Sequence, residues 1–318
     1  MKKYILILLI LFPILVFSQA NKLIRQGLKA EDLEEQIRLF SEAITIEPDN
    51  LDAYFYRAVA KHNIGDFNGA ILDYTKVAFK EPTADVYFNR GNSRYSLMDY
   101  YGAKEDYTKA LELNKDFIEA KFSLAVTLND LEDYEGAIKE LEVPKLKNSA
   151  AIYLQLARAY NGLKNFNKAL ENYNAAVLIL PSTRTFFERG RFFMSINYYK
   201  KANEDFNRAV FLEQGNLPAG FFRGTSFLLL GNFKEALNDF SALCEFDITD
   251  FDAAIGLSIT YYRLNDIDNA KKYFLKAKSV LLGLNPDNPN TLELFQDTYW
   301  YQKQFFVLNE FYEEISAL

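Results

Sequence analysis

The stretch Tyr160–Pro181, YNGLKNFNKALENYNAAVLILP, has close counterparts elsewhere in the chain. YSLMDYYGAKEDYTKALEL (residues 95–113) precedes it, and LLLGNFKEALNDFSAL (residues 228–243) follows it. In each, an alanine is followed four residues later by an aromatic residue. This marker recurs at Ala70–Tyr74, Ala103–Tyr107, Ala137–Leu141 (with leucine in second place), Ala169–Tyr173, Ala202–Phe206, Ala236–Phe240 and Ala270–Phe274. Successive marker alanines are 33, 34, 32, 33, 34 and 34 residues apart, which indicates a repeat array.

Each period contains two helical patterns joined by a turn. Around Tyr160, apolar residues recur at spacings of three and four, which is typical of one face of a helix. The first face carries Tyr153, Leu156, Ala157 and Tyr160, and the second carries Ala169, Tyr173 and Ala176. KNF separates the two patterns, and Pro181 ends the second. The small Ala157 and Ala169 predict two helices in close approach, with aromatic side chains filling the space beside them.

The period and these residues resemble the tetratricopeptide repeat, a helix–turn–helix unit of about 34 residues. Other units carry an Arg-Gly variant of the first helix, at Arg90-Gly91, Arg189-Gly190 and Arg223-Gly224. The resemblance implies an all-α fold, a right-handed superhelical α-solenoid. It also implies that the first helices line a concave groove, that the second helices form the outer surface, and that the usual work is binding a protein segment.

The repeats divide the chain as follows. A partial first unit at 21–50 precedes seven complete units, at 51–83, 84–117, 118–147, 148–181, 182–216, 217–250 and 251–284, and a helical cap at 291–318 follows residue 290. Pro144 stands where a helical alanine is expected, so the unit 118–147 is predicted to have a truncated second helix and a loop. That loop is either an ordinary irregularity, or else a hinge or a loop that contacts a partner.

The first 20 residues read as a secretory signal peptide. Lys2 and Lys3 give a positive start, a mainly apolar run of 14 residues follows, and small residues stand at Ser18 and Ala20. We therefore expect an exported protein that is periplasmic, associated with the cell envelope or secreted. Cleavage after Ser18 and cleavage after Ala20 fit equally well. The alternative is retention as an anchor, for which the run is short.

Composition disfavours several classes of function. The net charge is −7, and removal of the two signal-peptide lysines makes it −9, so nucleic acid and anionic membranes are poor partners. His62 is the only histidine, which excludes a histidine metal cluster, and it reads as a surface or groove residue. The only cysteine, Cys244, lies in an apolar helical stretch and is expected to be buried, the alternative being a reactive thiol. No phosphate-binding or nucleophile motif occurs, so we expect no enzyme, no cofactor and no small-molecule substrate.

One position in the first helices carries an apolar residue in every complete unit. In the family it points toward the groove, and here it holds Phe55, Phe88, Phe122, Leu154, Phe187, Phe221 and Ile255. We call this set the apolar stripe. It is either a groove for an apolar helix or extended peptide, or a packing feature in which each side chain rests on its neighbour.

One turn further along, the groove positions include Asn92, Arg158 and Arg191. The two arginines either bind a partner carboxylate or are solvated. Some family members grip a terminal carboxylate with a clamp of lysine, asparagine and arginine. The corresponding positions hold Phe88, Asn92, Ser123, Ala151 and Gln155, so that clamp is absent here.

The C-terminal segment is unusually rich in aromatic residues, among them Tyr299, Trp300 and Phe305. A terminal cap needs one apolar face, and this segment has more aromatic surface than that. It is expected to be a cap, or else a surface for a partner or for self-association.

The leading hypothesis is a non-catalytic binding scaffold of the cell envelope, which holds a protein segment in its groove or at its aromatic tail. One alternative is a chaperone-like or assembly component that captures segments of exported proteins. Another, from a different class, is an accessory domain of an enzyme complex.

Overall fold

The computed structural model describes residues 19–142, 149–284 and 291–316, and within these ranges the chain is helical and has no β-strand. The first described helix covers residues 19–27. It is followed by α2 (Leu33–Ile46), α3 (Leu51–Asn63), α4 (Phe67–Lys80), α5 (Ala84–Ser96), α6 (Tyr100–Leu113), α7 (Ile118–Asp130), α8 (Tyr134–Leu141), α9 (Ala150–Gly162), α10 (Phe166–Ile179), α11 (Thr183–Ser195), α12 (Tyr199–Leu212), α13 (Leu217–Leu229), α14 (Phe233–Phe246), α15 (Phe251–Arg263), α16 (Ile267–Leu284), the short 3-10 helix η2 (Leu292–Phe295), α17 (Tyr299–Lys303) and α18 (Phe305–Ser316). The predicted all-α fold is confirmed.

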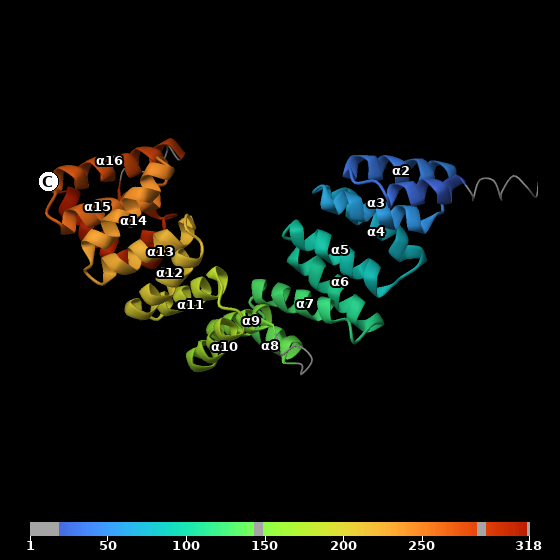
Figure 1. The fold of residues 1–318 in the computed structure, drawn as a ribbon, viewed down its shortest axis with the longest axis horizontal. Coiled ribbons are helices and arrows are strands. Elements are labelled where there is room, and N and C mark those ends of the chain that lie inside the picture. Colours follow the sequence, from blue (N-terminus) through green and yellow to red (C-terminus); the bar gives the residue numbers. More distant parts are fainter. Residues whose placement is uncertain (1–18, 143–148, 285–290, 317–318) are drawn as a thin grey trace, which may run out of the picture. The chain divides into compact units, whose positions relative to one another are not determined.

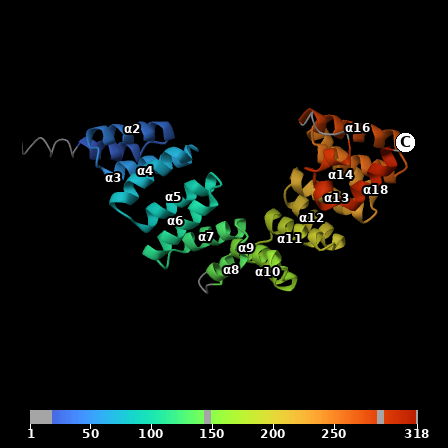
Figure 2. The same ribbon diagram turned by 180° about the vertical axis from the view of Figure 1, so that it is seen from behind.

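The chain forms two compact units, Met1–Ala169 and Leu170–Leu318, hereafter unit 1 and unit 2. In unit 1, helices α2 to α9 pack against one another in chain order, and in unit 2 helices α11 to α16 do the same (Figure 1). The odd-numbered helices from α3 to α15 are the first helices of their pairs. The last helix, α18, is labelled in the view from behind (Figure 2).

Every turn between the first and second helix of a pair contains one residue in the left-handed backbone region. These residues are Gly65, Met98, Glu132, Lys164, Asn197, Gly231 and Asn265. A left-handed residue is the common way to end a helix, and glycine adopts it most easily. Five of these seven residues are not glycine, so the repeat imposes the turn even where the side chain disfavours it.

The marker that revealed the repeat forms the core of each pair. All seven marker alanines, from Ala70 to Ala270, are fully buried, and their aromatic or leucine partners are at most 6% exposed. A small residue opposite a large one lets two helices approach closely without leaving a void. In α5 the approach is closer still, because a β-carbon added to Gly91 would lie 2.8 Å from the ring of Tyr107.

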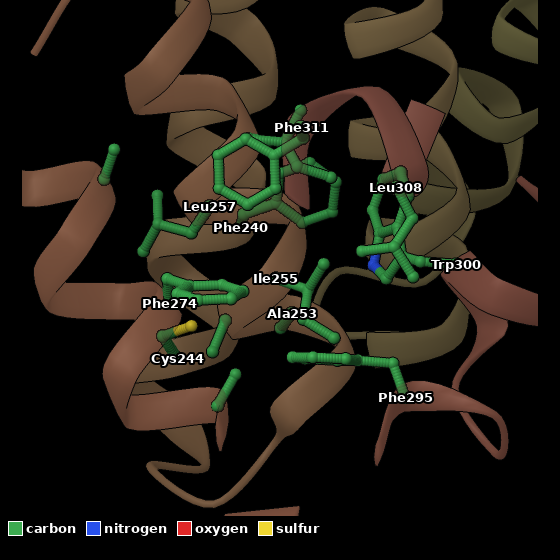
Figure 3. Packing of buried hydrophobic residues seen from close by; sticks show 14 of the residues in the cluster. Phe240, Cys244, Ala253, Ile255, Leu257, Phe274, Phe295, Trp300, Leu308 and Phe311 are labelled. Atoms are coloured by element: carbon green, nitrogen blue, oxygen red, sulfur yellow. The ribbon is translucent and has the colours of Figure 1, made fainter. Parts of the chain in front are cut away.

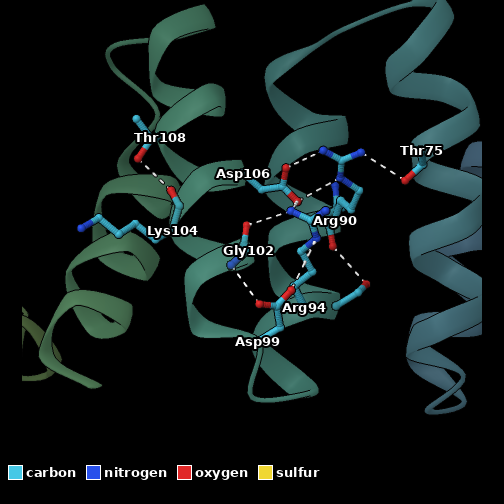
Figure 4. A network of polar contacts seen from close by, with 10 residues as sticks. Thr75, Arg90, Arg94, Asp99, Gly102, Lys104, Asp106 and Thr108 are labelled. Carbon is cyan, nitrogen blue, oxygen red and sulfur yellow. Dashed lines mark hydrogen bonds and ion pairs between the residues drawn. The ribbon is translucent and has the colours of Figure 1, made fainter. Parts of the chain in front are cut away.

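The arginines of the Arg-Gly variant, together with Arg57, connect the two helices of a pair. In α5, the Arg90 guanidinium donates to both carboxylate oxygens of Asp106 in α6, over 2.6 and 2.9 Å (Figure 4). The same bidentate pair, always 16 residues apart, recurs at Arg57–Asp73, Arg189–Asp205 and Arg223–Asp239. These aspartates are almost completely buried. Each pair therefore ties a first helix to its second helix by charge-assisted hydrogen bonds.

Two further expectations concern single segments. Helix α8 has 8 residues where the other complete second helices have at least 14, so the truncation predicted from Pro144 is confirmed, while residues 143–148 lie outside the described residues. Cys244 is a free, buried cysteine, as expected. Burial raises the pKa of its thiol to about 11, so it stays protonated at neutral pH. Residues 1–18 of the expected signal peptide also lie outside the described residues.

Candidate binding groove

The apolar stripe is unevenly exposed. Phe55, Phe88 and Phe122 of unit 1 are half-buried, and Leu154 is buried. In unit 2, Phe187 and Phe221 are half-buried and Ile255 is completely buried.

Four of the stripe phenylalanines rest on the aromatic marker residue of their own pair. The ring centroids are 5.7 Å apart for Phe55–Tyr74 and 5.9 Å apart for Phe88–Tyr107, Phe187–Phe206 and Phe221–Phe240. Phe122 differs, because its pair has Leu141 in the marker position. The two alternatives for the stripe are therefore not exclusive: these four rings pack within their own repeats and are still partly exposed.

The polar groove positions have partners within the chain. Asn92 Oδ1 accepts a hydrogen bond from the Tyr107 hydroxyl over 2.8 Å. Arg158, in unit 1, forms an ion pair with Asp130 at 2.8 Å. Arg191, in unit 2, lies over the rings of Phe187 and Phe222. Both arginines remain about half exposed.

Unit 1 has an open cavity of about 270 Å³ among its first helices. It is lined by His62 of α3, Asn92, Tyr95 and Ser96 of α5, Tyr107 of α6, and Phe122, Ser123 and Val126 of α7. Phe122 and Asn92 were predicted as groove residues, and His62 was placed on the surface or in the groove. Tyr95, Ser96 and Tyr107 were not proposed as binding residues. Tyr95 and Ser96 lie one turn after Asn92 in the first helix, and Tyr107 lies on the facing second helix. These positions could have predicted them from the sequence.

The His62 side chain sits in a defined hydrogen-bond chain. Its Nδ1 lies 2.9 Å from Ser93 Oγ, and Ser93 Oγ donates to the carbonyl oxygen of Asn89 over 3.1 Å. The direction of the His62–Ser93 hydrogen bond follows the tautomer of the ring: a protonated Nδ1 donates to Ser93, and an unprotonated Nδ1 accepts from the Ser93 hydroxyl. Burial lowers the pKa of His62, which keeps the ring neutral at pH 7.

In unit 2 the C-terminal segment covers the corresponding part of the first helices. Trp300 is completely buried, and its ring centroid lies 6.0 Å from that of Phe240 in α14 (Figure 3). The ring centroid of Phe221 in α13 lies 6.2 Å away. The indole nitrogen donates to the carbonyl oxygen of Asp252, in α15, over 2.8 Å. Gly256 leaves room for the indole, because a β-carbon there would lie 2.8 Å from it. The stripe residue Ile255 belongs to the same core cluster as Trp300.

The three tail residues named from the sequence differ in exposure. Trp300 is inside, Tyr299 is half-buried against Phe221 and Phe222, and Phe305 is 38% exposed. Phe306, which was not singled out, is 87% exposed.

Asp252 holds the segment through its side chain as well. One carboxylate oxygen accepts a hydrogen bond from the backbone N–H of Tyr299 over 2.9 Å. Desolvation by the packed segment raises the pKa of this carboxyl to about 7, and the nearby charge of Asp250 also raises it. The N–H groups of Tyr299 and Trp300 oppose the increase.

We expect docking of the C-terminal segment to weaken as pH rises. The docked carboxyl has a pKa of about 7 against an ordinary value of 3.8, so undocking releases a proton between these values. Stability is therefore highest at the acidic end and falls as the pH rises toward 7. Urea midpoints at pH 5 and pH 8 measure this. Asp252→Asn should reduce the difference between the two urea midpoints. Asp268→Asn, at an exposed acid of α16, should leave that difference unchanged. An equal difference between the two midpoints in both variants would contradict the assignment to Asp252.

Among the described residues, no group of three or more histidine, cysteine or acidic side chains is placed to hold a metal ion. In the same part of the chain, no helix has the length and apolarity needed to cross a membrane.

Comparison with known families identifies the helix pairs. Models of the tetratricopeptide repeat match residues 84–117, 150–182 and 251–280. Each of these three segments matches the tetratricopeptide repeat and spans one helix pair. The first is the pair α5 and α6, whose residues line the cavity.

Two curated relatives match parts of the chain. The chain is 30% identical to the human tetratricopeptide repeat protein 13 over 136 residues, which is 42% of this chain and 16% of that protein. It is 24% identical to superkiller protein 3 of Schizosaccharomyces pombe over 184 residues, or 54% of this chain and 13% of that protein. The chain thus spans less than a fifth of either relative.

Solved structures share the fold. A tetratricopeptide repeat protein from Parabacteroides merdae matches with a TM-score of 0.64 at 17% identity, covering 76% of this chain and 99% of that one. The Cut9–Hcn1 hetero-tetramer of the APC/C matches with a TM-score of 0.57 at 15% identity, covering 89% of this chain and 55% of that one. Yeast Tom70 matches with a TM-score of 0.55 at 18% identity, covering 94% and 64%. At these identities the likeness shows the fold alone.

Proposed function

We propose that this protein is a non-catalytic scaffold that holds a segment of a partner protein against the first helices of unit 1. The cavity among α3, α5 and α7 carries the proposal, since it combines apolar walls with hydrogen-bonding groups. Binding pockets characteristically have that composition. In unit 2 the equivalent face is covered by the chain's own C-terminal segment.

The repeat family supports this assignment, because tetratricopeptide repeats typically mediate protein–protein interactions. One similar structure, Cut9–Hcn1, is itself a hetero-tetramer. The acidic net charge of −7 favours a protein partner over nucleic acid.

Phe122→Ala should weaken partner binding by about 1–2 kcal/mol, the range of an aromatic anchor. Phe122 lines the cavity, and its pair offers Leu141 where other pairs offer an aromatic ring, so it is the stripe residue best suited to this test. The partner is first identified by cross-linking in an envelope extract, and affinity is then measured with the purified components.

The matched control is Phe79→Ala on the second helix α4, where the ring is 83% exposed. Unchanged affinity in Phe122→Ala, with the fold intact by circular dichroism, would refute the groove as the binding site. Cross-linking to many unrelated apolar segments, instead of a few stoichiometric partners, would favour the chaperone-like alternative.

We also propose that the protein is exported and that the mature chain begins at Gln19. Ala20 is fully buried beside Phe40, Ala43 and Ala53, in the first described helix. Cleavage after Ser18 keeps this contact, whereas cleavage after Ala20 removes it. The intact mass of the protein from the envelope fraction distinguishes a start at Gln19, a start at Asn21 and an uncleaved chain.

A further inference from the structure

We propose that the partner segment held by unit 1 is an extended stretch that carries basic residues spaced between apolar ones. The inference rests on the proposed function and names the chemistry of the partner. Three observations carry it: a row of unpaired acids beside the apolar stripe, the pairing of the cations on the same helices, and the use of the same position by the chain's own C-terminal segment.

A row of acids accompanies the apolar stripe in unit 1. Asp52, Asp85 and Glu119 each stand three residues before the stripe phenylalanine of their own helix, in α3, α5 and α7. Residues three apart are neighbours on the surface of a helix, so each acid lies beside its phenylalanine. All three acids are exposed, and none of them forms an ion pair with the residues that the structure describes.

The cations of α3 and α5 are held by buried aspartates of the second helices. They pair as Arg57 and Lys61 with Asp73, and as Arg90 and Arg94 with Asp106. Within the described part of the chain, Lys121 of α7 is the one cation of these three helices outside an ion pair. The acids of the row outnumber it, and the resulting negative charge favours a basic partner over an acidic one.

The chain itself uses this position to hold a segment. In α15 the acid three residues before the stripe residue Ile255 is Asp252, and its carboxylate accepts the backbone N–H of Tyr299 over 2.9 Å. The three acids of unit 1 occupy the same position in their own repeats. A carboxylate at this position therefore reaches a hydrogen-bond donor of a segment that lies on the first helices.

The spacing of the acids fits an extended chain. Neighbouring first helices are in contact, since Ser93 of α5 shares a hydrogen bond with His62 of α3, and Tyr95 of α5 donates to Asp130 of α7. The axes of packed helices lie about 8–10 Å apart, and an extended chain advances about 3.3 Å per residue, so a basic side chain at about every third residue reaches successive acids. The residues between them place apolar side chains on the stripe.

The test uses a dye-labelled peptide of three Lys-Leu-Ser triplets as the probe and fluorescence anisotropy as the readout. A peptide of three Glu-Leu-Ser triplets has the same apolar residues and the opposite charge. We expect saturable binding of the basic peptide, at least about tenfold tighter than that of the acidic peptide, because like charges oppose association. The affinity of the basic peptide should fall between about 50 mM and about 500 mM salt, because salt screens exposed charges.

Two double variants locate the charge that matters. Asp85→Asn with Glu119→Gln should weaken binding of the basic peptide about fivefold, through the loss of two exposed ion pairs. The matched control is Glu34→Gln with Glu135→Gln, at exposed acids that also stand second in their helices, the second helices α2 and α8. Both double variants remove the same net charge and the same interaction with the helix dipole. The control should therefore change affinity by less than about twofold.

The proposal is overturned if the basic peptide does not bind saturably or if the acidic peptide binds as well. It is also overturned if both double variants lower affinity equally, since net charge alone then attracts the peptide, or if Phe122→Ala leaves the affinity for the peptide unchanged. The groove function is judged separately, by Phe122→Ala in the assay with the partner. Failure of the peptide together with weakened partner binding in Phe122→Ala rejects the basic segment and leaves the groove in place.

Discussion

Trp300→Ala is expected to destabilise the C-terminal end of unit 2 by about 3–5 kcal/mol, the usual loss when a buried large aromatic side chain becomes alanine. The indole is completely buried, and it touches helices α13, α14 and α15 at once. Its removal leaves a cavity next to Ile255 and deprives the Asp252 carbonyl of its N–H donor.

The loss should be local, since each pair in a repeat array depends mainly on its neighbours. Hydrogen exchange should therefore show loss of protection in α15 to α18, while α3 to α6 keep theirs. Phe306→Ala is the matched control: the ring is 87% exposed, and we expect a change within about 0.5 kcal/mol. Equal effects of the two substitutions would show that the segment is not docked as described.

Arg90→Ala is expected to cost about 3–5 kcal/mol, because it leaves the Asp106 carboxylate buried without its bidentate partner. Asp106 is 3% exposed in its side chain and Arg90 is 13% exposed. Arg94 also lies near Asp106, at 3.2 Å, and offsets part of the loss. Thermal unfolding followed by circular dichroism measures the effect.

An exposed ion pair serves as the control, because it tests whether the loss of stability comes from burial or from charge pairing alone. Lys109 and Glu112 of α6 form an ion pair of 2.7 Å with both side chains about half exposed. Exposed pairs contribute little, so Lys109→Ala should leave the unfolding midpoint almost unchanged. Replacing Arg90 and Asp106 together by apolar residues should cost less than Arg90→Ala. A double-mutant cycle that shows no coupling between Arg90 and Asp106 would contradict the structural role of that pair.

The fold was predictable because its determinants are local and repeated. The marker alanine and the aromatic four residues later lie on one helix face, so a single sequence displays the buried surface of every pair. The Arg–Asp pairs were visible in the same pattern, since each aspartate stands three residues after a marker alanine. The pairs were not predicted, because a charged residue beside an apolar helix face is usually assumed to be exposed to solvent.

The use of the groove was less predictable because it depends on contacts between distant residues. Phe88 and Phe122 occupy the same position in neighbouring pairs, but Phe88 packs on Tyr107 and Phe117, and Phe122 lines the cavity. Periodicity cannot separate them. Nor does it reveal that Trp300 contacts Asp252, 48 residues earlier, and thereby covers the face that in unit 1 stays open.

The buried position of Trp300 also gives the protein an optical signal of its own. It is the only tryptophan in the chain, so selectively excited emission comes from one site at the C-terminal end of the array. Docked, the indole is surrounded by aromatic rings and shielded from water, and its emission lies toward the blue. Released, it becomes solvated and its emission shifts to the red. Docking and release of this end can therefore be followed in the unlabelled protein.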